Sequence, residues 1–243
     1  MADEQAKNNE NQLKVQKSDY LTPVHWNERW EQGRIKGFHL PHVNELLSEH
    51  LHSLINGRKK LRIFVPLCGK SVDMIWLANQ GHIVIGVEFS KLAILQFFGE
   101  NSLEYTATSV DKLVNGELFQ NKEGNIMIYK CNLFDLSSDI IGQVDAILDR
   151  AAFSAIMPVE RQKYRDLMIS TMHTHTRYGL ILENFDHTIM SGPPYCISPT
   201  MLEQIFGDQL NIEKIGEKAD SRERWINIGH KYFTNALYIL TIK

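Results

Sequence analysis

The stretch LRIFVPLCGKSVDMIWLANQGHIVIGVEFS, residues 61–90, decides the fold of this chain. It opens with an apolar run that ends at Leu67, beside a turn that contains one glycine, Gly69. A stretch with helical apolar spacing follows, and then a second apolar run that ends at an acid, Glu88. A strand, a glycine turn, a helix, a second strand and a terminal acid indicate the first half of a nucleotide-binding βαβ unit.

Two residues of this unit are placed to meet a ligand. Gly69 has no Cβ, so its backbone can approach a bound molecule closely. Glu88 is expected at the carboxyl end of the second strand, where a carboxylate accepts hydrogen bonds from ribose hydroxyls. The three-glycine dinucleotide fingerprint is absent, so two interpretations stay open: a ribose-binding unit and a purely structural turn.

Apolar runs and helical patterns alternate along the rest of the chain. Helices are predicted at 42–55, 90–100, 158–172 and 200–206, and further strands at 126–135, 144–148, 178–182, 211–215 and 236–242. A turn at 123–125 predicts that 117–120 and 126–129 pair as a hairpin, and a charged loop is expected at 219–231. The alternation predicts an α/β fold, a mostly parallel Rossmann-like sheet with helices on both faces and a C-terminal antiparallel hairpin.

The N-terminal residues divide into a polar tail and an aromatic segment. Residues 1–19 are rich in Asn, Gln, Lys and Glu, which predicts a disordered tail ahead of a single domain, 20–243. Within about 20–40, a helix is expected to place Trp26 and Trp30 on one face. These tryptophans either pack the helix onto the core or belong to a lid whose aromatic faces cover a ligand.

Composition and charge exclude several classes of protein. The 243 residues carry a net charge of −3 with a pI near 6.4, which argues against a nucleic-acid binder. Three separated cysteines without a CxxC pair indicate neither a disulfide framework nor a zinc site. No apolar stretch approaches the roughly 20 residues that span a bilayer, and the N-terminus lacks the apolar core of a signal peptide. We therefore expect a cytoplasmic protein without membrane or nucleic-acid partners.

Residues at the ends of the predicted strands are the candidate site residues, because ligands bind beyond the carboxyl ends of an open α/β sheet. These ends carry Leu67–Gly69, Glu88, Asn132–Leu133, Asp149–Arg150 and Glu183–Asn184. A cofactor is expected to contact the first four. Arg150 either meets an anionic group of a ligand or forms a salt bridge with Asp149 or another acid. The histidines at 173, 175 and 187 have no carboxylate at ligand spacing, so no metal site is predicted.

Short motifs occur in a specific order from about Leu21 to the C-terminus. They are WNERW at 26–30, GFH at 37–39, PLCGKSVDM at 66–74, GHIVIGVEFS at 81–90, FDL at 134–136, DRAAF at 149–153 and GPPY at 192–195. Together they resemble the thiopurine S-methyltransferase family. The resemblance implies a class I methyltransferase that binds S-adenosylmethionine, releases S-adenosylhomocysteine and takes a small-molecule thiol as acceptor. We further expect a monomer.

The resemblance assigns the cofactor to the strand ends and the aromatic segment, at Trp26, Trp30, Leu67, Gly69, Glu88, Asn132, Leu133 and Arg150. It implies that the two tryptophans cover the cofactor and that the turn with Gly69 lies along its amino-acid portion. It also implies that Glu88 binds the ribose hydroxyls and that Asn132 and Leu133 lie beside the adenine.

The resemblance also implies that Arg150 and Arg224 are catalytic and that, with Phe38, they bind the acceptor. The thiolate is the reacting form of a thiol, and a nearby arginine lowers the pKa of a thiol by stabilising that anion. We therefore expect the two arginines to favour the thiolate during an in-line displacement. The sequence leaves open whether Arg222 or Arg224 faces the acceptor, and it predicts that the GPPY segment forms a wall of the pocket.

The expected acceptor is a small aromatic or heterocyclic thiol of the thiopurine type. One alternative is an enzyme for simple thiols or inorganic sulfur, selenium or tellurium species. Another is a homologue that binds the cofactor without catalysis. A dinucleotide oxidoreductase is disfavoured because the three-glycine turn is missing.

Overall fold

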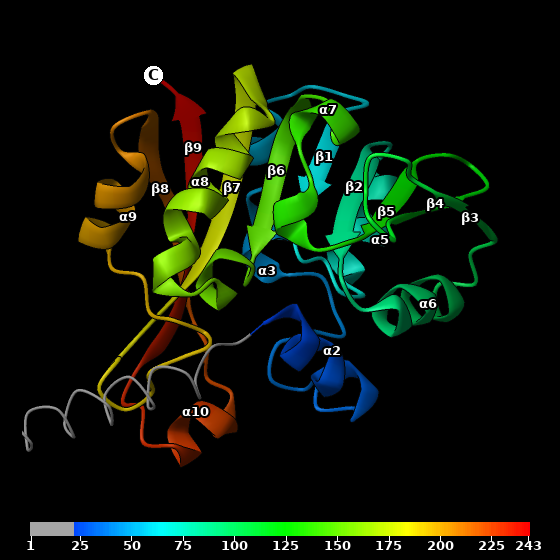
Figure 1. The fold of residues 1–243 in the computed structure, drawn as a ribbon. Coiled ribbons are helices and arrows are strands. Elements are labelled where there is room, and N and C mark those ends of the chain that lie inside the picture. The colour runs from blue at the N-terminus through cyan, green and yellow to red at the C-terminus, as the bar shows by residue number, and fades with distance from the viewer. Residues whose placement is uncertain (1–21) are drawn as a thin grey trace, which may run out of the picture.

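The computed structural model describes residues 22–243, so the predicted disordered tail at 1–19 lies outside the described residues. Through the described part of the chain runs one nine-stranded sheet, in the order β3-β4-β5-β2-β1-β6-β7-β9-β8. Helices cover both of its faces (Figure 1).

Parallel strands form the centre of the sheet, namely β1 (Arg62–Val65), β2 (Ile83–Glu88), β5 (Ile126–Lys130), β6 (Val144–Arg150) and β7 (Met172–Phe185). Antiparallel strands complete the two edges, with β4 (Glu117–Asn121) and β3 (Tyr105–Ser109) beside β5, and β9 (Phe233–Ile242) and β8 (Leu210–Ala219) beside β7. The mostly parallel sheet, the hairpin formed by β4 and β5, and the C-terminal antiparallel pair are thus confirmed.

Two layers of helices bury the faces of the central strands. One layer holds α3 (Glu45–Glu49), α4 (Leu51–Ile55), α5 (Val72–Asn79) and α6 (Lys91–Glu100), and the other holds α7 (Ser138–Ile141), α8 (Arg161–Ser170) and α9 (Pro199–Phe206). In β1, Ile63 faces the first layer and Phe64 the second, and both are fully buried. A parallel strand covered on both faces is apolar throughout, which explains the unbroken apolar run in the sequence before Leu67.

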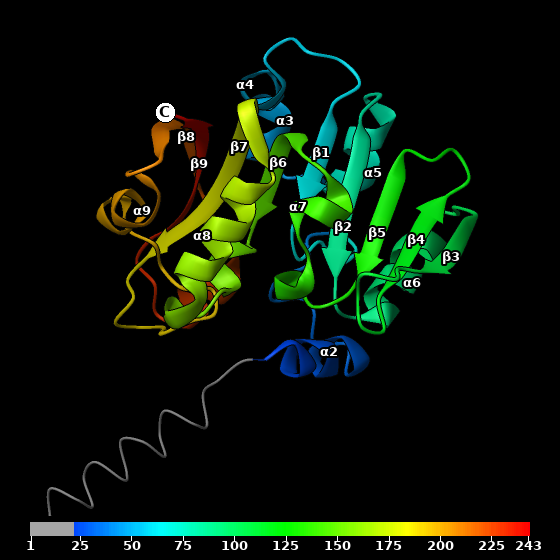
Figure 2. The same ribbon diagram turned by 45° about the horizontal axis from the view of Figure 1, so that its top comes forward.

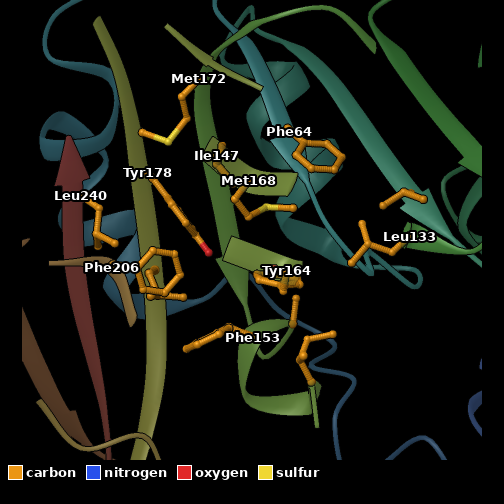
Figure 3. Close-up of a cluster of buried hydrophobic side chains, with 14 of the residues drawn as sticks. Phe64, Leu133, Ile147, Phe153, Tyr164, Met168, Met172, Tyr178, Phe206 and Leu240 are labelled. Atoms are coloured by element: carbon orange, nitrogen blue, oxygen red, sulfur yellow. The ribbon is translucent and has the colours of Figure 1, made fainter. Parts of the chain in front are cut away.

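Large aromatic side chains build the core beneath α8 and α9. Tyr164 and Phe206 of these helices pack against Phe153 and Tyr178, with ring centroids 5.3 to 5.9 Å apart (Figure 3). All four side chains are fully buried. They anchor the second helical layer on the sheet.

The Asp149 carboxyl lies among these rings with no exposed surface. It accepts hydrogen bonds from the hydroxyls of Tyr164 and Tyr178 at 2.5 and 2.7 Å. It also accepts hydrogen bonds from the backbone N–H groups of Ala152 and Phe153 at 3.2 and 3.0 Å. The carboxyl therefore ties the chain that leaves β6 to the core, and this chain carries part of the site.

Some predicted elements have different bounds. The helix predicted at 42–55 is divided into α3 and α4 at His50, whose ring packs on Gly216 of the edge strand β8. The helix predicted at 158–172 begins as the 3-10 turn η3 (Pro158–Glu160) and ends with α8 at Ser170, because Met172 already pairs with Val144. Both differences arise from contacts between segments far apart in the sequence.

Three further segments differ between the prediction and the structure. The strand predicted at 126–135 ends at Lys130, and the 3-10 turn η1 (Leu133–Asp135) follows it. The charged loop at 219–231 contains a short helix, α10 (Glu223–Asn227). The sequence did not predict β3, since all its residues are exposed and carry no apolar pattern.

α2 (Pro23–Glu31) belongs to neither layer. It lies across the carboxyl ends of the central strands, beyond their arrowheads in Figure 2. Pro23 stands at its first position, where the missing N–H costs no hydrogen bond. The space between this helix and the strand ends becomes the site.

Candidate active site

α2 and the carboxyl ends of β1, β2, β5 and β6 enclose a cavity of about 1160 Å³, counted with its open mouth. Its lining includes every residue that the family resemblance assigned to the cofactor, namely Trp26, Trp30, Leu67, Gly69, Glu88, Asn132, Leu133 and Arg150. Phe38, predicted to line the acceptor pocket, also borders it. We call this space the first cavity.

Glu88 lies at the end of β2 and is almost fully buried. Its Oε2 accepts the N–H of Gly69 at 2.9 Å, and its Oε1 accepts the N–H of Ser90 at 2.7 Å. Burial raises the pKa of Glu88, and these backbone hydrogen bonds oppose that rise. Because each carboxylate oxygen has two acceptor sites, both oxygens keep capacity for a ligand hydroxyl.

Gly69 has a positive φ of 51° and lies beneath the indole of Trp30. A Cβ at this position would lie 2.8 Å from Cζ2 of Trp30 and 3.9 Å from Oε2 of Glu88. Trp30 is itself buried, with 5% of its surface exposed. The missing side chain therefore keeps the turn, the indole and the acid close together at the floor of the cavity.

Replacing Gly69 by alanine is expected to weaken binding of S-adenosylhomocysteine by about tenfold or more, because Trp30 must move out of the cavity wall. Gly57→Ala is the matched control, since Gly57 has a φ of 70° and nothing within 4 Å of the added Cβ. Both variants should lose about 1–2 kcal/mol of stability from the left-handed backbone. Calorimetry with equal affinities for the two variants would contradict the role given to Gly69.

Arg150 ends β6 and reaches into the first cavity. Its Nε donates to Oδ2 of Asp73 in α5 at 3.1 Å, and its Nη1 donates to the carbonyl of Phe38 at 3.3 Å. Of the two interpretations from the sequence, the salt bridge exists, but its partner is Asp73 and not Asp149. The arginine is thus held in a fixed orientation, and it lines the cavity as well.

A second cavity of about 900 Å³, again counted with its open mouth, adjoins the first and shares with it Trp26, Phe38, Arg150, Ala151 and Ala155. Its other walls come from the end of β7, the GPPY segment and α10. Met190, Pro193, Pro194 and Trp225 give these walls an apolar character. The prediction that the GPPY segment forms a wall of the pocket is confirmed.

Arg224 and Arg222 both line the second cavity, but their surroundings differ. Arg224 stacks on Trp225, 3.8 Å from the ring centroid, and its Nη1 donates to the carbonyls of Lys36 and Gly37 at 2.8 and 2.7 Å. Burial lowers its pKa to about 10, so the guanidinium is still charged at neutral pH. Arg222, in contrast, is held by the carboxylate of Asp220.

The aromatic segment forms the wall between the two cavities. The ring of Phe38 lies edge-on to Trp26 and Trp30, with centroids 5.3 and 5.5 Å apart. Trp30 is buried, as expected for packing on the core, while Trp26 is partly exposed. That this segment opens and closes as a lid stays a prediction.

Several lining residues were not identified from the sequence. In the first cavity these are chiefly His39, Lys70, Phe89, Phe134 and Ile156, and in the second Asn44, Glu183, Met190 and Asn235. The position of Lys70 next to Gly69 was an available signal, and Glu183 was recognised as a strand end but received no role. Asn44 and Ile156 stand in segments that have no local pattern pointing to a site.

Nowhere in residues 22–243 do three or more His, Cys, Asp or Glu side chains come together as a metal site would need. Over the same range, no helix has the length and apolarity required to cross a membrane.

Solved structures with the same fold define the class of protein. The chain superposes on an S-adenosylmethionine-dependent methyltransferase from Anabaena variabilis with a TM-score of 0.61 at 14% identity, covering 93% of this chain and 96% of that one. It superposes on the Burkholderia thailandensis 1,6-didemethyltoxoflavin-N1-methyltransferase, solved with S-adenosylhomocysteine, with a TM-score of 0.60 at 12% identity, covering 90% and 87%. The fold is therefore that of the class I methyltransferases.

Sequence relatives narrow this class to a family. The model of the thiopurine S-methyltransferase family matches residues 21–243. Thiopurine S-methyltransferase of Panthera leo is 40% identical over 94% of this chain and 93% of its own length, and the probable enzyme of Danio rerio is 40% identical over 90% and 94%. The chain belongs to the thiopurine S-methyltransferase family and is an S-adenosylmethionine-dependent methyltransferase.

The first cavity fits S-adenosylmethionine in three respects. Glu88 offers a buried carboxylate with acceptor capacity for the ribose diol. The missing side chain at Gly69 lets the Trp30 indole pack directly on the turn and cover the floor of the cavity. Leu133 and Phe89 supply apolar surface for a flat base.

Proposed function

We propose that this enzyme transfers the methyl group of S-adenosylmethionine to the sulfur of a small aromatic or heterocyclic thiol. The observation that carries the proposal is the second cavity, which lies beside the first and combines apolar and aromatic walls with the guanidinium groups of Arg150 and Arg224. Apolar and aromatic walls suit a flat ring, and guanidinium groups suit an anionic sulfur. The names of the relatives, thiopurine S-methyltransferases, support the same acceptor class.

The first cavity is proposed to hold the cofactor. Glu88 would bind the ribose hydroxyls, the turn at Gly69 would follow the amino-acid portion, and Asn132 with Leu133 would flank the adenine. Trp26 and Trp30 would exclude water from this space, with Leu67 beside the turn. When bound, S-adenosylmethionine supplies an electrophilic methyl group attached to a positive sulfur.

Arg150 and Arg224 are proposed to act on the acceptor sulfur. A positive charge beside a thiol stabilises the thiolate, which is the nucleophile. The hydrogen bonds of Arg150 to Asp73 and Phe38, and those of Arg224 to the carbonyls at 36 and 37, hold both groups in place before the acceptor enters. Alignment of reacting groups contributes about 7–11 kcal/mol in well-oriented systems.

Replacing Arg224 by alanine is expected to lower kcat/KM for thiophenol about 10- to 100-fold, because a hydrogen bond to a charged group contributes about 1.5–3 kcal/mol. Arg222→Ala is the matched control, since Asp220 already holds the Arg222 guanidinium. Methyl transfer is measured with labelled S-adenosylmethionine. Equal losses in the two variants would contradict the assignment of Arg224 to the sulfur.

The acceptor class itself is tested on the unaltered enzyme with a panel of thiols. We expect turnover of thiophenol and heterocyclic thiols to exceed that of sulfide, selenide and simple alkyl thiols. The opposite order would favour the alternative enzyme for small or inorganic acceptors, and cofactor binding without any turnover would favour the non-catalytic alternative. A cytoplasmic location and a monomeric state stay predictions.

A further inference from the structure

Glu183 lies near the end of β7, and its side chain lines the second cavity. Glu183 is two residues after Ile181 in β7, so both side chains point to the same face of the sheet. Ile181 and Leu148 of β6 pack against the first helical layer on that face. Arg150 is two residues after Leu148 in β6, and it pairs with Ile181 of the neighbouring strand β7. Glu183 and Arg150 therefore stand on the same face of neighbouring strands.

Glu183 is partly buried, and one oxygen of its carboxyl has no contact with solvent. Among the described residues, Oε2 has no partner within hydrogen-bond distance, and the neighbouring Ser154 hydroxyl oxygen has none either. Burial raises the pKa of Glu183, and the Ser154 hydroxyl and the charge of Arg150 oppose this rise. An acid that lines a ligand cavity together with two arginines, and whose pKa is raised, is a candidate to accept a proton from a bound molecule.

Some charged groups near the Glu183 carboxyl stabilise its negative charge, and one destabilises it. Arg150 of β6 and Arg224 of α10 interact with it favourably, and Asp149 of β6 interacts unfavourably. Arg222 lines the same cavity, but Asp220 holds its guanidinium. The carboxyl thus stands beside two cations that could hold an anionic sulfur.

The acceptor class explains why a base is useful here. An aromatic thiol such as thiophenol loses its proton from sulfur and needs only the arginines. A heterocyclic thiol with a ring nitrogen next to the C–S carbon exists mainly as the thione, with its proton on nitrogen and a neutral C=S group. Cations near sulfur do not take up that N–H proton, so a base beside the ring nitrogen accelerates its removal.

We propose that Glu183 accepts the ring N–H proton of a heterocyclic thione bound in the second cavity, which makes it a catalytic residue for that substrate class. The N–H bond breaks and an O–H bond forms on Glu183, while the nitrogen electron pair becomes a C=N bond and the C=S π pair moves to sulfur. The sulfur then forms a bond to the methyl carbon as the bond from that carbon to the sulfonium breaks. The products are the S-methyl heterocycle, S-adenosylhomocysteine and a protonated Glu183, which returns its proton to water.

The test compares Glu183→Gln with the unaltered enzyme on pyridine-2-thione and on thiophenol, which has no ring N–H. We expect kcat on the thione to fall about 100-fold or more, the usual range for loss of a general base, with thiophenol turnover changed by less than about threefold. The acidic limb of the pH profile on the thione should also disappear, because only ionised Glu183 accepts a proton. Glu213→Gln, at an exposed acid of β8, is the matched control.

A spectrum gives a readout that does not depend on turnover. Pyridine-2-thione bound with S-adenosylhomocysteine should show the absorption of the deprotonated anion in the unaltered enzyme and of the neutral thione in Glu183→Gln. A neutral thione spectrum in the unaltered enzyme at all pH values would overturn the inference even if the variant failed to fold.

The inference rests on the proposed function, and the two fail differently. If the unaltered enzyme methylates neither compound, the acceptor class is wrong and the role of Glu183 falls with it. If it methylates both, and Glu183→Gln loses both equally or neither, the acceptor class stands and only the role of Glu183 is overturned.

Discussion

Replacing Asp149 by alanine is expected to lower the free energy of unfolding by about 3–5 kcal/mol, the largest stability effect predicted for this chain. The carboxyl is the acceptor for two tyrosine hydroxyls and two backbone N–H groups, and it has no exposed surface. Alanine leaves these buried donors without a partner and opens a cavity between the rings of Tyr164 and Tyr178. Each buried donor left unsatisfied costs about 1–3 kcal/mol before the structure relaxes.

Tyr164→Phe is the matched control for this experiment. It removes one donor but leaves Asp149 with three hydrogen bonds, so we expect a loss of only about 1 kcal/mol. Urea denaturation measures both variants, with the denaturant slope compared to show that the unfolded states are equivalent. A loss for Asp149→Ala no larger than that for Tyr164→Phe would show that this network is not a principal anchor of the chain after β6.

Replacing Glu88 by alanine is expected to weaken binding of S-adenosylhomocysteine about 100-fold or more. On the proposed role, two ribose hydroxyls lose a charged acceptor, and each such hydrogen bond contributes about 1.5–3 kcal/mol. The N–H groups of Gly69 and Ser90 lose their acceptor as well, so the turn that follows the amino-acid portion is loosened. Calorimetry measures the affinity, and Glu117→Ala, at a surface acid that pairs with Lys91, is the control.

The pH dependence of this affinity provides a second measurement. Burial raises the pKa of Glu88, so the carboxyl gains its proton at a higher pH than an ordinary glutamate. A protonated carboxyl has less acceptor capacity, so affinity should be full above the raised pKa and should fall as the pH drops through it. Glu88→Gln should lack this step. Wild-type affinity in Glu88→Ala would refute the ribose role.

The fold could be predicted from the sequence where local chemistry decides it. The central strands are buried on both faces, so they appear as continuous apolar runs, and Ser71 and Ser90 each cap the helix that follows a strand. Elements without such a pattern were missed or misplaced. All residues of the edge strand β3 are exposed and form no apolar pattern, and the break at His50 depends on its packing against Gly216.

Part of the candidate site could likewise be predicted from the sequence, and part depends on tertiary contacts. The sequence by itself placed Gly69, Glu88 and Arg150 at the first cavity, because they stand at the ends of strands and strand ends meet at one edge of a parallel sheet. Only the tertiary structure decided the partner of Arg150, which lies in α5, and the position of Arg224, which reaches the carbonyls at 36 and 37. It alone brought Glu183 into the second cavity with these arginines, because contacts between residues so far apart leave no local pattern in the chain.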